Sequence, residues 1–487
     1  MKKFLKWISI SLILLVIAGF AWGYWFTHKS IIPLQGTYQA SALQKEVTIY
    51  RDEWGIPHIY ANTLEDVFFA QGYAQAQDRL FEMDLSRRAV RGELSEILGK
   101  DLLDTDKFFL TVGFYRTAEK GEKIMTEDGL KYLQSFAEGV NAFINDNKDN
   151  LPLEFSLLNY QPDPWVVSDS LAIGKYMSWV LGGNMQNELI LMAAAEKVDE
   201  QKFKDLLPSY PQDGITIMKN SWREAGVTYA KTADMLSLLD LTDRGQVGVP
   251  GVGIGSNNWV VSGSMTESGK PILANDMHLE IKAPSIWYQN HLKVTGKLNV
   301  TGVIFPGIPG VIVGHNEYIA WGVTNLNPDV QDLYIEKRNP DNTYQFEYQG
   351  KWEDAEVIKY NIPVKGEQPV PYEVLITRHG PIITEVFEQP ESVPLALKWT
   401  NLEPTSELDA LIAIDQAKNW ESFKKGLENF KVPAQNFVYA DVEGNIAYRG
   451  NGLIPIRSKG DGQIPVPGWT GEYEWKGYVP YKELLLL

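Results

Sequence analysis

A glycine-rich segment divides this chain into two regions of different character. It covers residues 245–255, of which five are glycine and one is proline, and it ends immediately before Ser256. That composition disfavours both helix and strand. Helical patterns precede the segment and strand patterns follow it, so the chain must combine a helix-rich first part with a strand-rich second part.

The first part begins with two short strands and continues as helices. Residues 47–50 and 56–60 have the composition of strands around a tight turn. Asn62 or Thr63 can then cap a helix, because acidic residues follow in its first turn and favour the helix dipole. Helical spacing of apolar residues continues to about Asp240, with breaks at prolines.

The second part consists of short apolar runs between Gly, Pro and Asn turns, which are typical of strands. These runs lie at residues 259–262, 271–274, 298–300, 311–313 and 318–321, and a helix is predicted near residues 420–429. Helices followed by strands predict an α+β fold with packed layers.

Composition excludes several classes of protein. Hydrophobic residues make up 44% of the 487 residues, which is enough for a large core. The formal charge of -17 disfavours nucleic acid as a partner, since an acidic surface repels phosphate. The absence of cysteine removes disulfides, thiolate nucleophiles and cysteine-based zinc sites.

The N-terminus predicts contact with a membrane. Lys2, Lys3 and Lys6 precede an apolar run at residues 7–26, which is long enough to span a bilayer as a helix. Positive charge before the run favours a single-pass anchor in the cell membrane, with the globular part outside the cytoplasm. A cleaved signal with a weak site at residues 18–21, giving a secreted protein, is the alternative; a buried core helix is a third reading.

Conventional catalytic motifs are missing from the sequence. It contains no G-x-S-x-G, no H-E-x-x-H and no Walker A motif, and its six histidines show no metal-binding spacing. The glycines around Gly251 do not follow a predicted strand, so a dinucleotide site is not expected.

Ser256 offers a different chemistry. Its Oγ could attack the carbonyl of Gly255, which has no Cβ in the way, and water would then cleave the resulting ester. The new α-amine would have a pKa of roughly 7.7–8.0 and could serve as the general base for the same hydroxyl. From the chemistry alone, an ordinary serine at the start of a strand is the favoured interpretation.

Several motifs resemble the penicillin acylase family, and they occur in the family's order over roughly residues 45–480. They are GIPHI at 55–59, GYAQAQDRL at 72–80, RR at 87–88, GELSE at 92–96, GSNNWVV at 255–261, NDMHL at 275–279, FPG at 305–307, GHN at 314–316 and AWGVT at 320–324.

The resemblance implies an N-terminal-nucleophile (Ntn) hydrolase with a four-layer αββα sandwich. It implies one precursor that yields two chains and cleaves a small N-acyl amide. The predicted division is an anchor or signal at 1–30, an α-chain region at 31–235, a spacer at 236–255 and a β-chain region at 256–487.

The resemblance also assigns site residues. Ser256 matches the nucleophile, His278 lies where relatives carry a residue that orients it, and Asn325 matches a backbone oxyanion donor. Leu279 and Val313 match acyl-pocket positions that are aromatic in phenylacetyl-preferring relatives. Either a β-lactam side chain or an acyl-homoserine lactone is therefore open as the substrate.

A calcium site is the remaining expectation. Asp329 and Asp332 flank a backbone carbonyl, which suits a hard cation, although such a pair is also compatible with a solvated turn. The resemblance implies one structural calcium ion, with Glu188 as a further carboxylate ligand and the carbonyls of Gln331 and Pro455 completing the set.

The chain departs from the family pattern at its C-terminus. Relatives continue into a segment that carries an oxyanion asparagine, whereas this sequence ends in four leucines. We therefore expect a truncated β-chain region and keep two alternatives to an active amidohydrolase. One is a catalytically impaired, surface-tethered remnant, and the other is a solute-binding or scaffold protein.

Overall fold

The computed structural model describes residues 2–195, 197–206, 255–279, 281–387 and 393–487. The predicted spacer at 236–255 lies outside these residues except for Gly255, and so does the end of the α-chain region beyond residue 206. The fold is α+β, as the sequence predicted.

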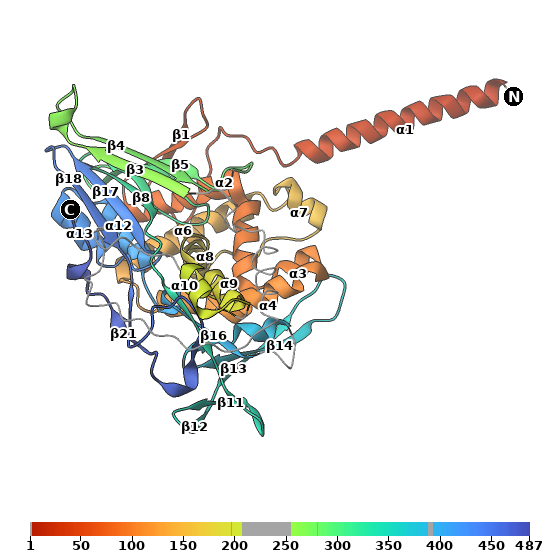
Figure 1. Ribbon diagram of the computed structural model, residues 1–487. Coiled ribbons are helices and arrows are strands. Elements are labelled where there is room, and N and C mark those ends of the chain that lie inside the picture. The colour runs from red at the N-terminus through yellow and green to blue at the C-terminus, as the bar shows by residue number, and fades with distance from the viewer. Residues whose placement is uncertain (1, 196, 207–254, 280, 388–392) are drawn as a thin grey trace.

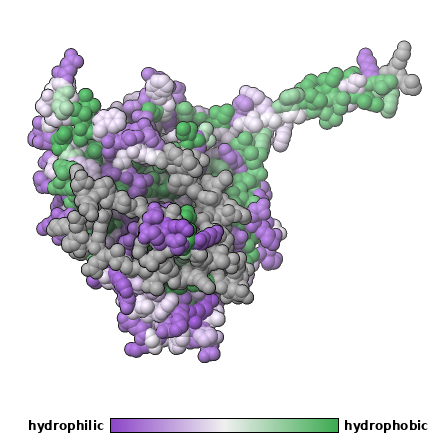
Figure 2. All heavy atoms as spheres, viewed as in Figure 1, coloured by the Kyte–Doolittle hydropathy of each residue, from purple (hydrophilic) through white to green (hydrophobic). Residues whose placement is uncertain are grey.

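Helix α1 (Lys2–His28) extends away from the rest of the molecule (Figure 1). Figure 2 shows that it is hydrophobic along most of its length, and its apolar side chains are exposed. In the described part of the chain it is the one helix long and apolar enough to cross a membrane, a test that a signal sequence also passes.

The remaining helices fall mostly in the first region. They are α2 (Leu64–Arg91), α3 (Leu94–Leu98), α4 (Leu103–Val112), α5 (Phe114–Glu122), α6 (Glu127–Asp146), α7 (Leu153–Leu158), α8 (Val167–Gly182), α9 (Met185–Ala195), α10 (Glu200–Leu206), α12 (Glu407–Asp415) and α13 (Trp420–Leu427). Thr63 caps α2 as predicted, since its side chain accepts a hydrogen bond from the Asp66 backbone N–H at 3.1 Å.

An eight-stranded sheet unites the two regions, in the order β1-β2-β5-β6-β7-β8-β17-β18. Its strands are β1 (Thr48–Arg51), β2 (Pro57–Ala61), β5 (Tyr288–Val294), β6 (Leu298–Ile304), β7 (Val313–Asn316), β8 (Ile319–Asn325), β17 (Gln435–Asp441) and β18 (Ile446–Asn451). Strand β2 pairs in parallel with β5, so His58 lies opposite His291. All other pairs in this sheet are antiparallel.

The sheet has a different neighbour on each face. Helix α2 packs on β2 and β5, and Phe423 of α13 packs against Trp321 and Phe437 on the same core side. On the other face a hairpin of β3 (Gly255–Val261) and β4 (Ile272–His278) lies against β8 and β17 (Figure 1). The described residues thus form a helical layer, a full sheet and part of a second sheet, three of the layers in the predicted sandwich.

Smaller sheets form the end of the molecule opposite this hairpin (Figure 1). Their strands are β9 (Gln331–Ile335), β10 (Arg338–Asn339), β11 (Asn342–Tyr348), β12 (Lys351–Asp354), β13 (Glu356–Ile362), β14 (Val370–Thr377), β15 (Gly380–Pro381), β16 (Leu395–Trp399), β19 (Pro455–Arg457), β20 (Val466–Pro467) and β21 (Trp475–Tyr478).

Helices α2 and α6 approach each other through two glycines. A Cβ at Gly72 would lie 2.2 Å from the Phe136 carbonyl oxygen, and a Cβ at Gly139 would lie 1.9 Å from that of Phe69. Both distances are far below van der Waals contact, so each helix needs a residue without a side chain where it meets the other's backbone.

We expect Gly139→Ala to lower the free energy of unfolding by about 1–3 kcal/mol, because the added methyl forces the two helices apart. Gly174→Ala in α8 is the matched control, since its Cβ would meet nothing within 4 Å. The control should be neutral or stabilise by up to about 1 kcal/mol through helix propensity. Urea unfolding of both variants tests this, and equal stabilities would contradict it.

A buried ion cluster ties the small sheets together around His379. Its ring nitrogens lie 2.8 Å from Glu336 Oε1 and 2.9 Å from Glu474 Oε1, and the ring stacks on Tyr334 with centroids 4.1 Å apart. Burial by itself lowers the pKa of His379, but the hydrogen bonds with the two carboxylates outweigh it and raise the pKa.

Stability should therefore depend on pH through His379. A raised pKa in the folded state means that the stabilisation is complete below the unfolded value of about 6.5 and is lost as the pH rises through the folded value. We expect His379→Gln to reduce the free energy of unfolding more at pH 6 than at pH 9. Urea titrations at the two pH values test this, and a pH-independent difference would contradict it.

Candidate active site

Ser256 lies near the start of strand β3, as the sequence predicted. Strand β3 pairs with β4 so that Gly255 is opposite His278 and Ser256 is opposite Met277. Ser256 is partly exposed and Gly255 is exposed, and a Cβ added at Gly255 would meet no described residue within 4 Å. The Gly255–Ser256 peptide bond thus stands at an accessible end of the hairpin, beside the residue predicted to orient the serine.

Asn275 holds the hairpin to the large sheet. Its Oδ1 accepts a hydrogen bond from the Val323 backbone N–H at 2.6 Å, and its Nδ2 donates to the Val323 carbonyl at 2.9 Å. Nδ2 also lies 3.2 Å from the Asn257 carbonyl. The amide reaches the strand because Gly322 has no side chain: a Cβ there would lie 2.6 Å from Asn275 Oδ1.

These bonds bring the predicted catalytic residues to one region. Asn257 follows Ser256 on β3, and Val323 is two residues before Asn325 on β8. Asn275 links Asn257 to Val323, so the serine and the end of β8 lie within a few residues of the same contact.

His278 lies at the end of β4, next to an acidic side chain of the same strand. Its Nε2 is 2.8 Å from Asp276 Oδ2, and the two side chains are 40% and 71% exposed. The imidazole is therefore accessible at the hairpin end where Ser256 lies.

Asn325 ends β8 and is held by the next strand. Its Oδ1 accepts a hydrogen bond from Gln435 Nε2 at 2.9 Å, and its backbone carbonyl accepts one from Asn436 Nδ2 at 3.0 Å. Two neighbouring side chains on β17 thus fix the strand end that the sequence predicted as an oxyanion donor.

Gln435 also borders an apolar cavity between α8, α12 and the large sheet. Its walls include Met177, Leu181, Trp287, Phe305, Ile308, Ile312, Val323, Leu411 and Phe430. Neither predicted pocket residue lines this cavity. Ile312 lines the cavity, whereas its neighbour Val313 does not, as expected where adjacent side chains alternate between faces. Leu279 is half-buried and packs at the edge of the core.

The predicted calcium ligands gather around an arginine. Arg457 Nη2 lies 2.6 Å from Asp332 Oδ1 and 3.0 Å from Asp329 Oδ1, while its Nε donates to Asp332 Oδ2 at 2.8 Å. Asp332 also accepts a hydrogen bond from Trp475 Nε1 at 2.5 Å. Among the described residues, no three acidic or histidine side chains converge into a ready-made metal site.

Glu188 adds a third carboxyl group to this cluster. It is fully buried on α9, and its Oε2 accepts a hydrogen bond from the Leu333 backbone N–H at 3.0 Å, while its Oε1 has no hydrogen-bond partner among the described residues. Burial and the two aspartates raise the pKa of Glu188 well above its ordinary range, and burial raises that of Asp329 to about 7. Three carboxylates facing one arginine fit a further cation by charge, though not by their present geometry.

The two carbonyl ligands lie beside this cluster. Gln331 caps the start of α9, since its Oε1 accepts hydrogen bonds from the backbone N–H groups of Asn184 and Met185 at 2.6 and 2.8 Å. Pro455 is two residues before Arg457 on β19 and is buried.

Sequence reasoning missed three residues that organise these sites. Asn275 and Gly322 both lie in motifs that resemble the family, but neither residue was assigned a role. The sequence signal for their contact was a small amide side chain in one motif and a strand glycine in another. Arg457 had no signal, because it meets Asp332 from a strand more than a hundred residues away.

An α+β fold with a serine opening a strand, in a hairpin stacked on a larger sheet, has the arrangement of the Ntn-hydrolase class. The chain belongs to the penicillin amidase family, whose model matches residues 46–485.

Three relatives illustrate the similarity. An acyl-homoserine lactone acylase, QuiP, of Pseudomonas aeruginosa is 30% identical, over 92% of this chain and 54% of its own length. Penicillin acylase 2 proenzyme of Pseudomonas sp. is 29% identical, over 93% and 58%, and penicillin G acylase of Escherichia coli is 28% identical, over 91% and 58%. The chain thus spans little more than half the length of these relatives.

The solved structure of a thermostable penicillin G acylase from Alcaligenes faecalis is also similar. It is 26% identical with a TM-score of 0.43, over 47% of this chain and 41% of that one.

Asn275→Ala should release the hairpin, since it leaves the Val323 N–H and C=O without partners at about 1–3 kcal/mol each. We expect faster hydrogen exchange at the amides of β3. The matched control is Asn258→Ala on the same hairpin, because the Asn258 Nδ2 makes no hydrogen bond with the described residues. Equal exchange in the two variants would contradict the role of Asn275.

Proposed function

We propose that this chain carries the nucleophile half of an acyl-amide hydrolase that cuts its own Gly255–Ser256 bond. The observation that carries this proposal is the accessible Gly255–Ser256 junction at the hairpin end, held beside the end of β8 by Asn275. Family membership supports the same reaction.

The proposed chemistry uses Ser256 twice. In the precursor its Oγ attacks the Gly255 carbonyl, the acyl group moves from nitrogen to oxygen, and water hydrolyses the ester. In the mature chain the new α-amine takes the proton from Oγ as the hydroxyl attacks the substrate carbonyl. His278 orients the serine, and the backbone N–H of Asn325 donates to the developing oxyanion.

An N-acyl group with an aliphatic or aromatic body is the proposed substrate. The apolar cavity beside Gln435 supports this, since most of its walls are Leu, Ile, Val, Met and Phe side chains. The aliphatic side chains among these walls support an acyl-homoserine lactone as the second candidate, alongside the acyl side chain of a β-lactam.

The proposed location is the cell membrane, with α1 as a single-pass anchor and the globular part outside the cytoplasm. The exposed apolar surface of α1 supports this, and removal of α1 as a signal would give a secreted protein instead.

A structural calcium ion is also proposed, held by Glu188, Asp329 and Asp332 with the carbonyls of Gln331 and Pro455. The Glu188 Oε1, which has no partner among the described residues, supports it. The raised pKa values of Glu188 and Asp329 also support it, because a bound cation would stabilise the charged carboxylates. The ion would supply positive charge to a buried carboxylate cluster that Arg457 only partly neutralises.

Ser256→Ala should abolish self-cleavage, because the attacking hydroxyl is gone. Intact-mass spectrometry after expression should find a fragment starting at Ser256 in the parent and an uncut chain in the variant. Ser262→Ala, a few residues along the same region, is the control and should still cut. If the parent stays in one piece, the tethered non-catalytic remnant is supported and the hydrolase proposal fails.

Calcium should raise the melting temperature by about 5 °C or more over a chelated sample, through mass action on the folded state. Asp329→Asn should remove most of this shift, since it deletes a proposed carboxylate ligand. Asp104→Asn is the control, because its side chain is 65% exposed far from the cluster. The same melting temperature with and without calcium would contradict the site.

A further inference from the structure

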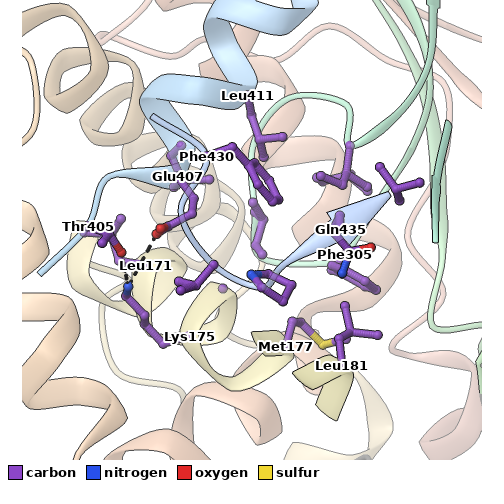
Figure 3. Close-up of a pocket in the computed structure, with 18 of the residues that line it drawn as sticks. Leu171, Lys175, Met177, Leu181, Phe305, Thr405, Glu407, Leu411, Phe430 and Gln435 are labelled. Atoms are coloured by element: carbon purple, nitrogen blue, oxygen red, sulfur yellow. Dashed lines mark hydrogen bonds and ion pairs between the residues drawn. The ribbon is translucent and has the colours of Figure 1, made fainter. Parts of the chain in front are cut away.

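The apolar cavity has one polar end. Lys175 of α8, together with Thr405 and Glu407 at the start of α12, forms that end (Figure 3). Gln435 lies away from these three residues, with apolar side chains between (Figure 3). The cavity is thus an apolar space with a hydrogen-bonding group at each of two separate places.

Lys175 is held as a buried charge. Its side chain is 3% exposed, and its ammonium donates to Thr405 Oγ1, lies 3.4 Å from Glu407 Oε2 and 3.5 Å from the Glu403 carbonyl oxygen. These three acceptors use the three donors of the ammonium group. Burial lowers the pKa of Lys175, although Glu407 opposes the shift.

One carboxylate oxygen of Glu407 remains available to accept a hydrogen bond. Its Oε2 faces Lys175, while its Oε1 is buried and has no hydrogen-bond partner among the described residues. A buried carboxylate oxygen without a donor is costly, and few remain so in folded proteins. The unpartnered oxygen belongs to a residue that lines the cavity, so a ligand there can reach it.

The charges at this end select the kind of donor. Lys175 and Glu407 neutralise each other, so a carboxylate or an ammonium on the ligand would bring an unbalanced charge into an apolar space. A neutral hydroxyl avoids that penalty and donates one hydrogen bond to Oε1. The remainder of the ligand must be apolar, because the cavity walls between the two ends are apolar.

The opposite end connects to the proposed catalytic residues. Gln435 donates a hydrogen bond to Asn325, the proposed oxyanion donor. Val323, on the cavity wall, is hydrogen-bonded to Asn275. Along α8, Lys175 and Leu181 are separated by six residues, or about 9 Å of helix rise. An acyl group with its carbonyl near Asn325 would therefore extend toward Glu407.

We propose that the cavity binds acyl chains that carry a hydroxyl group at their far end, with that hydroxyl donating to Glu407 Oε1. This inference rests on the proposed function, since it takes the acyl group as the occupant. Lys175 is then a positioning residue, which fixes the Glu407 carboxylate through the contact with its Oε2.

Calorimetric titration of the full chain tests the proposal without requiring turnover. The ligands are hexanoate, octanoate and decanoate, each compared with its ω-hydroxy form. At the best-fitting length we expect the hydroxylated acid to bind about tenfold more tightly, as a hydrogen bond to a charged acceptor provides. Equal affinity within every pair would overturn the proposal.

Two variants separate the hydroxyl contact from general packing. Glu407→Leu should reduce the preference for the hydroxylated acid to within about twofold. The double variant Lys175→Met with Glu407→Leu removes both buried charges, so it should lose the preference while remaining folded. Lys359→Met with Glu373→Leu, an exposed pair on β13 and β14, is the matched control and should keep it. A preference that survives the double variant would overturn the proposal.

The outcome is distinguishable from that of the proposed function. A preference for hydroxylated acids in a chain that never cleaves amides would support this binding site and count against hydrolysis. Amide hydrolysis with no such preference, measured as equal kcat/KM for matched N-acyl anilides, would overturn the binding site alone.

Discussion

The contact between one asparagine and one glycine determines how the two sheets of this protein meet. Asn275 satisfies both backbone groups of Val323, and Gly322 gives the amide room to approach. A strand buried under a second sheet has no water to bond its polar groups, so this pairing fixes both the separation of the sheets and their alignment. The positions of Ser256, His278 and Asn325 all follow from that alignment.

Local signals made much of the fold predictable. Thr63 caps α2, the first two strands lie within a residue of their expected limits, and α13 begins at Trp420. Capping and strand alternation depend on near neighbours, which a sequence displays directly. The two-region division followed from the same patterns, because periodicity changes at Ser256.

Long-range pairing was the part that the sequence did not reveal. The small sheets bring β9 beside β16 and β20, and their order depends on contacts between residues sixty or more positions apart. The cavity likewise joins Lys175 to Glu407 across 232 residues. At the predicted metal site both aspartates contact Arg457, a residue that could be found only from the fold.

The parallel pairing of β2 with β5 has a consequence for how the chain is made. His58 and His291 are separated by 233 residues, so β2 cannot pair with β5 until that length of chain has been synthesised. Until then, the edge of β2 that later pairs with β5 has no partner strand. Such a distant pairing slows folding and exposes the nascent chain to aggregation. It also pairs strands from before and after Ser256 within one sheet. Two separately synthesised halves would therefore each lack a partner strand.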